Sequence, residues 1–227
     1  MHPREREVGL SSKRVLVVLA ISAVLFVLLL PAIYNPPTPG GRAEAAATVR
    51  NIVNALRSYE NDYGHFPEIV KPGPSGRVVI CVGDPACKIS DGPNKLLFDV
   101  LRAIPRGANA NHALNPKKQK YFEMALAKDP KKPCSGFADG PKFSAADQGS
   151  FFDPWGRQYC IVFTTDGSGT LDLSGVYSDL AGPENLIRFP CAVFSLGKDG
   201  IPGGKGYEGK FRKPATNEAP NDVVSWQ

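Results

Sequence analysis

An uncharged, apolar run near the N-terminus limits what this chain can fold into more than any other feature. It extends from Val15 to Tyr34 and reads VLVVLAISAVLFVLLLPAIY. At about 1.5 Å per residue, a helix of this length spans a hydrocarbon core about 30 Å thick. A cleavable secretory signal is the alternative, but the apolar part of such signals is usually only about 7–15 residues long. We therefore predict a retained transmembrane helix over residues 15–34.

The basic residues predict the orientation of this helix. Four of them precede the run, and none follows it before Arg42; the four are Arg4, Arg6, Lys13 and Arg14. Cytoplasmic flanks are enriched in Lys and Arg, so residues 1–14 are expected to form a cytoplasmic stub and the rest a periplasmic part. The prediction is a single-pass protein of the inner membrane. The net charge of +5 is spread along the chain and forms no basic stripe, which argues against a nucleic-acid partner.

A second helix is expected after a short linker. Residues 35–41 (NPPTPGG) are too rich in proline and glycine for a helix interior. From Arg42 onward, apolar residues recur at spacings of three and four, as on one face of an amphipathic helix. Gly64 and Pro67 then predict its end. The apolar residues are Ala46, Val49, Ile52, Val53, Leu56, Tyr59 and Tyr63.

The rest of the sequence, together with this helix, predicts an α+β domain over residues 42–227, in which the helix packs on a small antiparallel β-sheet. Runs of β-forming residues predict strands near 77–82, 158–164, 170–177 and 190–196. Shorter helices are expected at 94–104 and 117–128. Residues 129–150 are rich in Pro, Gly, Lys, Asp and Ser, which indicates loops.

The five cysteines fit an oxidising compartment, although their odd number leaves at least one without a partner. Cys81 and Cys87 bracket a Gly-Asp-Pro turn and are candidates for a small disulfide loop. Cys160 and Cys191 lie in two strand-like runs and are candidates for a cross-sheet disulfide. Cys134 would then be the cysteine without a disulfide partner. The alternative is that several are buried thiols. The sequence has no CxxC motif, and its three histidines are widely scattered, so a cysteine–histidine metal site is not predicted.

Four blocks of the sequence resemble the major pseudopilin of type II secretion, a type IV pilin-like family. They are the apolar run with Pro31 near its end, the helix end ALRSYENDYGHFP (55–67), the DPWG turn (153–156) followed by Gln158-Tyr159, and SLGKDG (195–200) with the tail DVVSW (222–226). The blocks occur in the family's order. The resemblance implies a pilin-like domain and a non-enzymatic subunit that assembles into or alongside the pseudopilus for protein export. It implies as partners other pseudopilins or copies of itself, the prepilin peptidase and the inner-membrane platform of the secretion machine.

The resemblance also implies a calcium site in the C-terminal loop. Asp199 and Asp222 would supply side-chain oxygens, and Leu196 and Ile201 would supply carbonyl oxygens, in keeping with the preference of calcium for about 6–8 oxygen ligands. Here the loop is longer than is usual in the family and carries several lysines, which oppose a divalent cation. The alternative is that Asp199-Gly200 is only a turn and Asp222 a capping or surface acid.

The N-terminus implies a processing site and raises a second function. The family's spacing places prepilin peptidase cleavage between Gly9 and Leu10. The glutamate that family members carry a few residues later, where it pairs with a neighbouring subunit, is replaced by Arg14. This change, the linker at 35–41 and the atypical insertion at 68–150 favour the alternative of a membrane-tethered periplasmic binding module that does not polymerise.

An enzyme is not predicted. No Gly-x-Ser-x-Gly or His-Glu-x-x-His motif is present, and the acidic loop residues Asp139 and Asp147 have no evident catalytic partner. Trp155, Tyr59 and Tyr63 are interpreted as packing residues rather than as ligands.

Overall fold

The long helix α2 (Gly41–Tyr63) forms because its apolar residues share one face. In the computed structural model, which describes residues 40–70, 79–165, 167–204, 206, 208–211 and 222–226, that face is buried and lies against the sheet. Val49, Ile52 and Leu56 are fully buried. The helix ends where Gly64 adopts a positive φ of 77° and its N–H donates to the carbonyl of Glu60.

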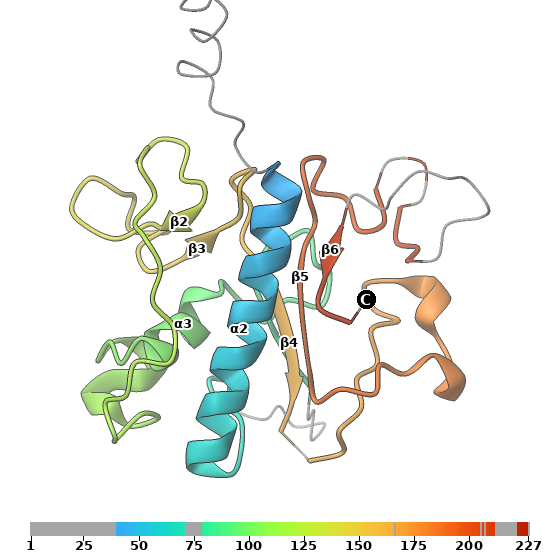
Figure 1. Cartoon of the computed structure of the whole chain (residues 1–227), viewed down its shortest axis with the longest axis horizontal. Helices are drawn as coiled ribbons and strands as arrows, with labels where there is room; N and C mark the ends of the chain where they lie inside the picture. The colour runs from blue at the N-terminus through green and yellow to red at the C-terminus, as the bar shows by residue number, and fades with distance from the viewer. Residues whose placement is uncertain are drawn as a thin grey trace, which may run out of the picture. The chain divides into compact units, whose positions relative to one another are not determined.

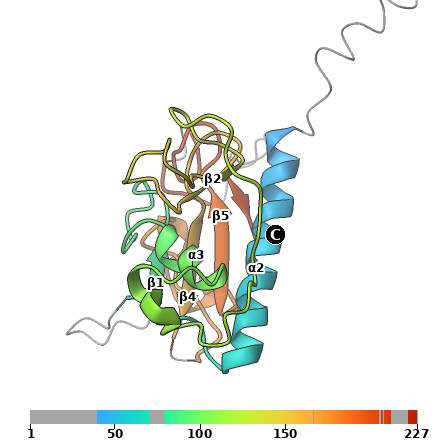
Figure 2. The same cartoon turned by 90° about the vertical axis from the view of Figure 1, so that its left-hand side faces the viewer.

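A four-stranded antiparallel sheet forms the centre of the domain (Figure 1). Its strands are β1 (Val79–Val82), β4 (Cys160–Thr164), β5 (Cys191–Ser195) and β6 (Val223–Val224), in the order β1-β4-β5-β6. In the register, Val82 lies opposite Ile161, Val162 opposite Ala192, and Ser195 opposite Val223. Helix α2 runs along one face of the sheet and contacts β5 and β6 (Figure 2).

Both faces of the sheet are covered, which explains why every residue of β4 and β5 is buried. Alternate residues point to opposite faces. Ile161, Phe163 and Val193 pack beneath α2, whereas Val162 and Phe194 enter a second core on the opposite face. The second core also takes residues from β1 and the loop after it, from residues 171–180 and from the C-terminal part of the chain; among them are Cys81, Cys87, Leu171, Leu173, Val176, Tyr177, Leu180, Phe211 and Trp226.

The region between β1 and β4 contains little regular structure. It comprises α3 (Lys95–Leu101), the 3-10 segment η1 (Gly107–His112) and a two-stranded sheet of β2 (Gly136–Phe137) and β3 (Phe151–Phe152). A cluster of aromatic rings fills its interior and joins the core beneath α2. The rings are those of Phe98, Phe122, Phe137, Phe151 and Tyr159.

Three buried asparagines replace much of the missing regular hydrogen bonding in this region. The Asn94 amide donates to the carbonyls of Phe151 and Tyr159 and accepts from the N–H of Phe151. The Asn109 amide likewise bridges backbone groups on both sides of η1. The Asn115 amide donates to two more carbonyls and accepts from the Tyr63 hydroxyl of α2. These amides fix the segment to the helix and the sheet, because a buried backbone group needs a partner.

The predicted fold class, an α+β domain headed by a transmembrane helix, is wrong. The structure has one long helix, α2, followed mostly by antiparallel sheet. Within the described residues, no helix is long and apolar enough to cross a membrane. Helix α2 has the necessary length, but it carries charged side chains such as those of Arg50 and Arg57 on its exposed face. The predicted span at 15–34, the stub at 1–14 and most of the linker at 35–41 lie outside the described residues.

Two further predictions of local structure are also wrong. Residues 117–128 form no helix; the segment is extended, with Tyr121 N–H bonded to the Leu101 carbonyl and Leu126 bridged to Phe137. Residues 170–177 form no strand beyond a single bridge from Leu171 to Ile187. In both segments, tertiary contacts outweigh the local propensity of the sequence.

Candidate functional site

The DPWG turn is built on the carboxylate of Asp153. One carboxylate oxygen accepts the N–H groups of Trp155 and Arg157, and the other accepts the hydroxyl of Ser195 at 2.5 Å. Asp153 is fully buried, and this burial raises its pKa. The turn is thereby joined to the end of β5, at the start of the C-terminal loop.

Trp155 connects this turn to the beginning of α2. The ring is partly buried against the core beneath the helix, as the sequence predicted. A methyl group added at Gly41 would lie 3.0 Å from the Pro154 side chain and 3.3 Å from the Trp155 ring. Helix and turn therefore approach closely here, and a side chain at position 41 would require Pro154 or Trp155 to shift.

Arg157 places a positive charge against the C-terminal loop. Its guanidinium lies 3.2 Å from the carboxylate of Asp84, which follows β1. It also occupies the space into which a side chain at Gly200 would project, and Gly200 has a φ of 67°. Glycine is therefore favoured at position 200 by its backbone conformation, and a side chain there would displace the Arg157 guanidinium.

Asp222 is the most unusual acid of the loop. It is 2% exposed, and one carboxylate oxygen accepts the Tyr177 hydroxyl and the Gly203 N–H, both at 2.7 Å. The other oxygen, Oδ1, is buried and has no hydrogen-bond partner among the described residues. Burial raises the pKa of Asp222 to about 6, and the charge of Asp199 adds to this rise.

The other residues implied in calcium binding lie in the same loop, and two of the oxygens concerned already accept hydrogen bonds. Asp199 is half-buried, and one of its oxygens accepts the N–H of Ile201. The Ile201 carbonyl accepts the N–H of Gly204. Leu196 is fully buried and follows β5 directly. The loop thus brings Asp199 near Asp222, whose buried Oδ1 atom has no hydrogen-bond partner among the described residues.

These residues fit a calcium ion in part. The partnerless Oδ1 of Asp222 and the nearby Asp199 carboxylate are suitable hard oxygen ligands. The guanidinium of Arg157 next to Gly200 opposes a cation. In the part of the chain that the structure describes, no group of three or more His, Cys, Asp or Glu residues is arranged to hold a metal ion. Any calcium site here therefore depends on backbone carbonyls for most of its ligands.

The structure brings together one of the two predicted cysteine pairs. The Sγ atoms of Cys81 and Cys87 are 3.5 Å apart, and both residues are thiols. Cys160 and Cys191 lie on opposite faces of the sheet, since Cys160 belongs to the second core and Cys191 to the core beneath α2. Cys191 is instead opposite Phe163 in the register. Cys134 is half-buried in a loop.

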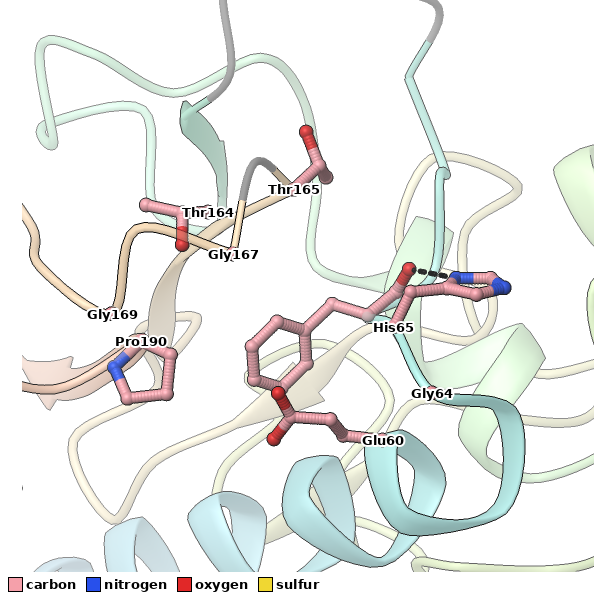
Figure 3. A pocket seen from close by; sticks show the side chains of 9 residues that line it. Glu60, Gly64, His65, Thr164, Thr165, Gly167, Gly169 and Pro190 are labelled. Carbon is pink, nitrogen blue, oxygen red and sulfur yellow. Dashed lines mark hydrogen bonds between the residues drawn. The ribbon is translucent and has the colours of Figure 1, made fainter.

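A pocket of about 230 Å³ lies at the far end of α2, away from the C-terminal loop (Figure 3). Glu60, His65 and Thr164 are among the residues that line it. The imidazole of His65 donates to the carbonyl of Phe66 and points away from the Glu60 carboxylate (Figure 3). These polar groups therefore do not converge on one point.

Sequence reasoning did not identify Tyr177 and Gly203 as partners of Asp222, or Arg157 and Asp84 as an ion pair beside the loop. The only signal was the Asp-rich and Gly-rich character of the segments, because the partners come from distant parts of the chain. The proposed cleavage site at Gly9 and Leu10 lies outside the described residues. Compared with known proteins, the chain matches no protein-family model, no curated protein sequence and no solved structure.

Proposed function

We propose that the chain is a non-enzymatic, pseudopilin-like subunit of a type II secretion machine, which assembles into or alongside the pseudopilus during protein export. One observation carries the proposal: two of the blocks on which the resemblance rests, the DPWG turn and SLGKDG with the tail DVVSW, meet at one corner of the domain beside the start of α2. The start of α2 contacts Trp155, and Arg42 donates to the Asp222 carbonyl at 3.5 Å. Asp153 binds Ser195. Segments that are distant in the sequence thus share one connected set of contacts.

The exposed face of α2 supports a role in contacts between subunits. Arg50, Asn51, Asn54 and Arg57 are exposed on this face, opposite the buried apolar residues. A polar helix face of this kind can contact a second subunit through hydrogen bonds and ion pairs. The partners would be other pseudopilins or copies of this chain, with the prepilin peptidase and the inner-membrane platform. The protein would be held at the inner membrane, with residues 42–227 in the periplasm. The basic residues before the uncharged run at 15–34 support this orientation.

The intact mass of the chain tests this proposal. The full chain is expressed in cells that contain a type II secretion machine and is extracted from their membranes. We expect a mass that lacks residues 1–9, because the peptidase cuts between Gly9 and Leu10. Gly9→Val should remain full-length, and Ser11→Ala, as a matched control, should be processed like the parent. A parent chain that keeps all nine residues contradicts the proposal.

The second candidate function is a periplasmic binding module that is held at the membrane and does not polymerise. Arg14 favours it, because a positive charge replaces the glutamate expected to pair with the amino terminus of a neighbour. The well-packed region between β1 and β4, which is large compared with the sheet, would supply its binding surface. A full-length N-terminus in the mass measurement supports this candidate.

We also propose that calcium binds in the C-terminal loop. Asp222 through Oδ1 and the Asp199 carboxylate would hold it, with carbonyl oxygens of Leu196 and Ile201. The ion would neutralise two neighbouring carboxylates and so stabilise the return of the chain into β6.

Thermal unfolding of the full chain, in calcium and in chelator, tests the calcium site. Binding to the folded state raises the unfolding midpoint with ligand concentration. Asp222→Asn should abolish the calcium-dependent rise, whereas the exposed Glu123→Gln should preserve it. Equal midpoints for the parent chain in calcium and in chelator would refute the site.

A further inference from the structure

Three cysteines converge in the core on the face of the sheet opposite α2. They are Cys81 from β1, Cys160 from β4 and Cys87 from the loop after β1, and at most 1% of each is exposed. The Sγ atoms of Cys81 and Cys87 are 3.5 Å apart. Cys160 belongs to the same buried core, on the same face of the sheet. Cys87 therefore contacts the Cys81 thiol and shares one buried core with Cys160.

The sheet register explains why Cys81 and Cys160 share a face. Cys81 lies opposite Val162, and Val162 and Cys160 point to the same side of β4 because residues two apart do so. Continued by one residue beyond β1, the same register places Gly83 opposite Cys160. A methyl group at Gly83 would lie 2.6 Å from the Cys160 Cα, so the close approach here depends on glycine.

A rigid turn brings Cys87 back over the sheet. The Asp84 side chain accepts the N–H of Ala86, and its carbonyl accepts the N–H of Cys87. Asp91 closes the loop on the strand, because its N–H donates to the Cys81 carbonyl and its carboxylate accepts the Cys81 N–H. The position of Cys87 is thus fixed by backbone contacts rather than by the thiols themselves.

The other two cysteines are separated from this cluster. Cys191 lies in the core beneath α2, on the other side of the sheet, and burial raises its pKa to about 11. Cys134 lies in the loop that precedes β2. The cluster is also not arranged as a metal site, since no such group of three ligands is present within the described residues.

We propose that Cys81, Cys87 and Cys160 form one oxidation site, in which Cys87 forms a disulfide with either of the other two and the remaining thiol exchanges the bond between the two pairings. The site adds a redox property that the proposed secretion function does not require.

The oxidant is a small or protein disulfide of the oxidising compartment. During folding, before the cluster is buried, the Cys87 thiolate attacks one sulfur of that disulfide and releases one thiolate of the oxidant. The thiolate of Cys81 or Cys160 then attacks the Cys87 sulfur and releases the second. Two protein thiols thereby lose two protons and two electrons, and the oxidant becomes two thiols.

Exchange then needs no external reagent. The Cys160 thiolate attacks the Cys87 sulfur of a Cys81–Cys87 disulfide, the Cys81 thiolate leaves, and the proton of Cys160 passes to Cys81. In the folded cluster the neighbouring Cys160 and Cys81 thiols lower the pKa of Cys87, which favours its thiolate as the leaving or attacking group in this exchange.

Alkylation and peptide mapping of the full chain test the proposal. The chain is equilibrated in a buffer of reduced and oxidised glutathione, quenched in acid, and alkylated under denaturing conditions. We expect three alkylated thiols of five. A tryptic digest separates the two pairings, because Cys81 and Cys87 lie in one peptide (78–88) and Cys160 lies in another (158–188). A Cys81–Cys87 disulfide is therefore a bond within one peptide, whereas a Cys87–Cys160 disulfide joins two peptides.

Single substitutions assign the bonds. Cys81→Ser should retain the bond between the two peptides, Cys160→Ser the internal bond, and Cys87→Ser neither. Cys191→Ser and Cys134→Ser are matched controls and should give the parental mixture of pairings. Alanine versions serve at any position where serine prevents a single cooperative unfolding transition.

Three results would overturn the proposal. In the first, Cys81→Ser has four alkylated thiols, which shows that Cys87 does not pair with Cys160. In the second, the parent chain holds a single pairing at every glutathione ratio. In the third, the disulfide involves Cys134 or Cys191.

Discussion

Replacing Asn94 by alanine should destabilise the domain more than any single hydrogen bond would suggest. The Asn94 side chain is fully buried, and its amide makes three hydrogen bonds to the backbone of Phe151 and Tyr159. Each such bond contributes a net of about 0.5–1.5 kcal/mol, and a buried polar group left without a partner costs about 1–3 kcal/mol. The substitution leaves three backbone groups without that partner. We expect the free energy of unfolding to fall by about 3–5 kcal/mol.

Urea-induced unfolding, followed by tryptophan fluorescence, measures this change. The midpoint should fall while the slope of free energy against urea stays constant, since the folded state keeps its extent of burial. Asn51→Ala on the exposed face of α2 is the control and should change the free energy by less than about 0.5 kcal/mol. A loss below about 1 kcal/mol for Asn94→Ala, at unchanged slope, would refute the role assigned to the buried amide.

Three further predictions concern charge, backbone conformation and oxidation. Burial raises the pKa of Asp99 despite its ion pair with Arg106, so the folded state binds this proton more tightly than the unfolded chain. Relative to Asp99→Asn, the parent should therefore lose stability in urea titrations as the pH rises above about 4, the pKa of an unperturbed aspartate. Gly200→Ala should cost up to about 1 kcal/mol more than Gly64→Ala in denaturant unfolding, because both residues have positive φ but only at Gly200 must the Arg157 guanidinium move away from Asp84; equal costs would refute this argument. Oxidation should stabilise Cys81→Ser by about 2 kcal/mol more than Cys160→Ser, because the Cys87–Cys160 disulfide of the first variant closes a larger loop than the Cys81–Cys87 disulfide of the second. Denaturant unfolding of the oxidised and reduced forms measures the difference, and a reversed order would contradict the prediction.

The spacing of apolar residues predicts helix α2 well, because one face of the helix is buried along its whole length. It also locates β1, β4 and β5, whose continuous β-forming runs reflect burial on both faces of the sheet. The region between β1 and β4 could not be predicted in the same way. Its conformation depends on Asn94, Asn109 and Asn115, and asparagine in a sequence signals a turn as readily as a buried amide.

Of the candidate site, the sequence predicts only the acidic residues and not their hydrogen-bond partners. Asp199 and Asp222 stand out near glycines, but the hydroxyl that binds Asp222 comes from Tyr177, 45 residues earlier. The cysteines show the same limit. Cys160 and Cys191 both lie in strand-like runs, and only the register between β4 and β5 reveals that they face opposite sides. Sequence patterns report burial and periodicity, whereas partners depend on how strands align.

The contact between Arg42 and the Asp222 carbonyl has a topological consequence, because it joins the first turn of α2 to the residue just before β6. The two ends of the folded unit are therefore neighbours, and a short peptide between them would close the chain into a ring at a small entropic cost. The same fold could then be cut open elsewhere, for example within the exposed turn near residues 140–142, to give a circular permutant. In such a permutant, α2 would be an internal element rather than the first, and the order of the other elements around the sheet would be unchanged.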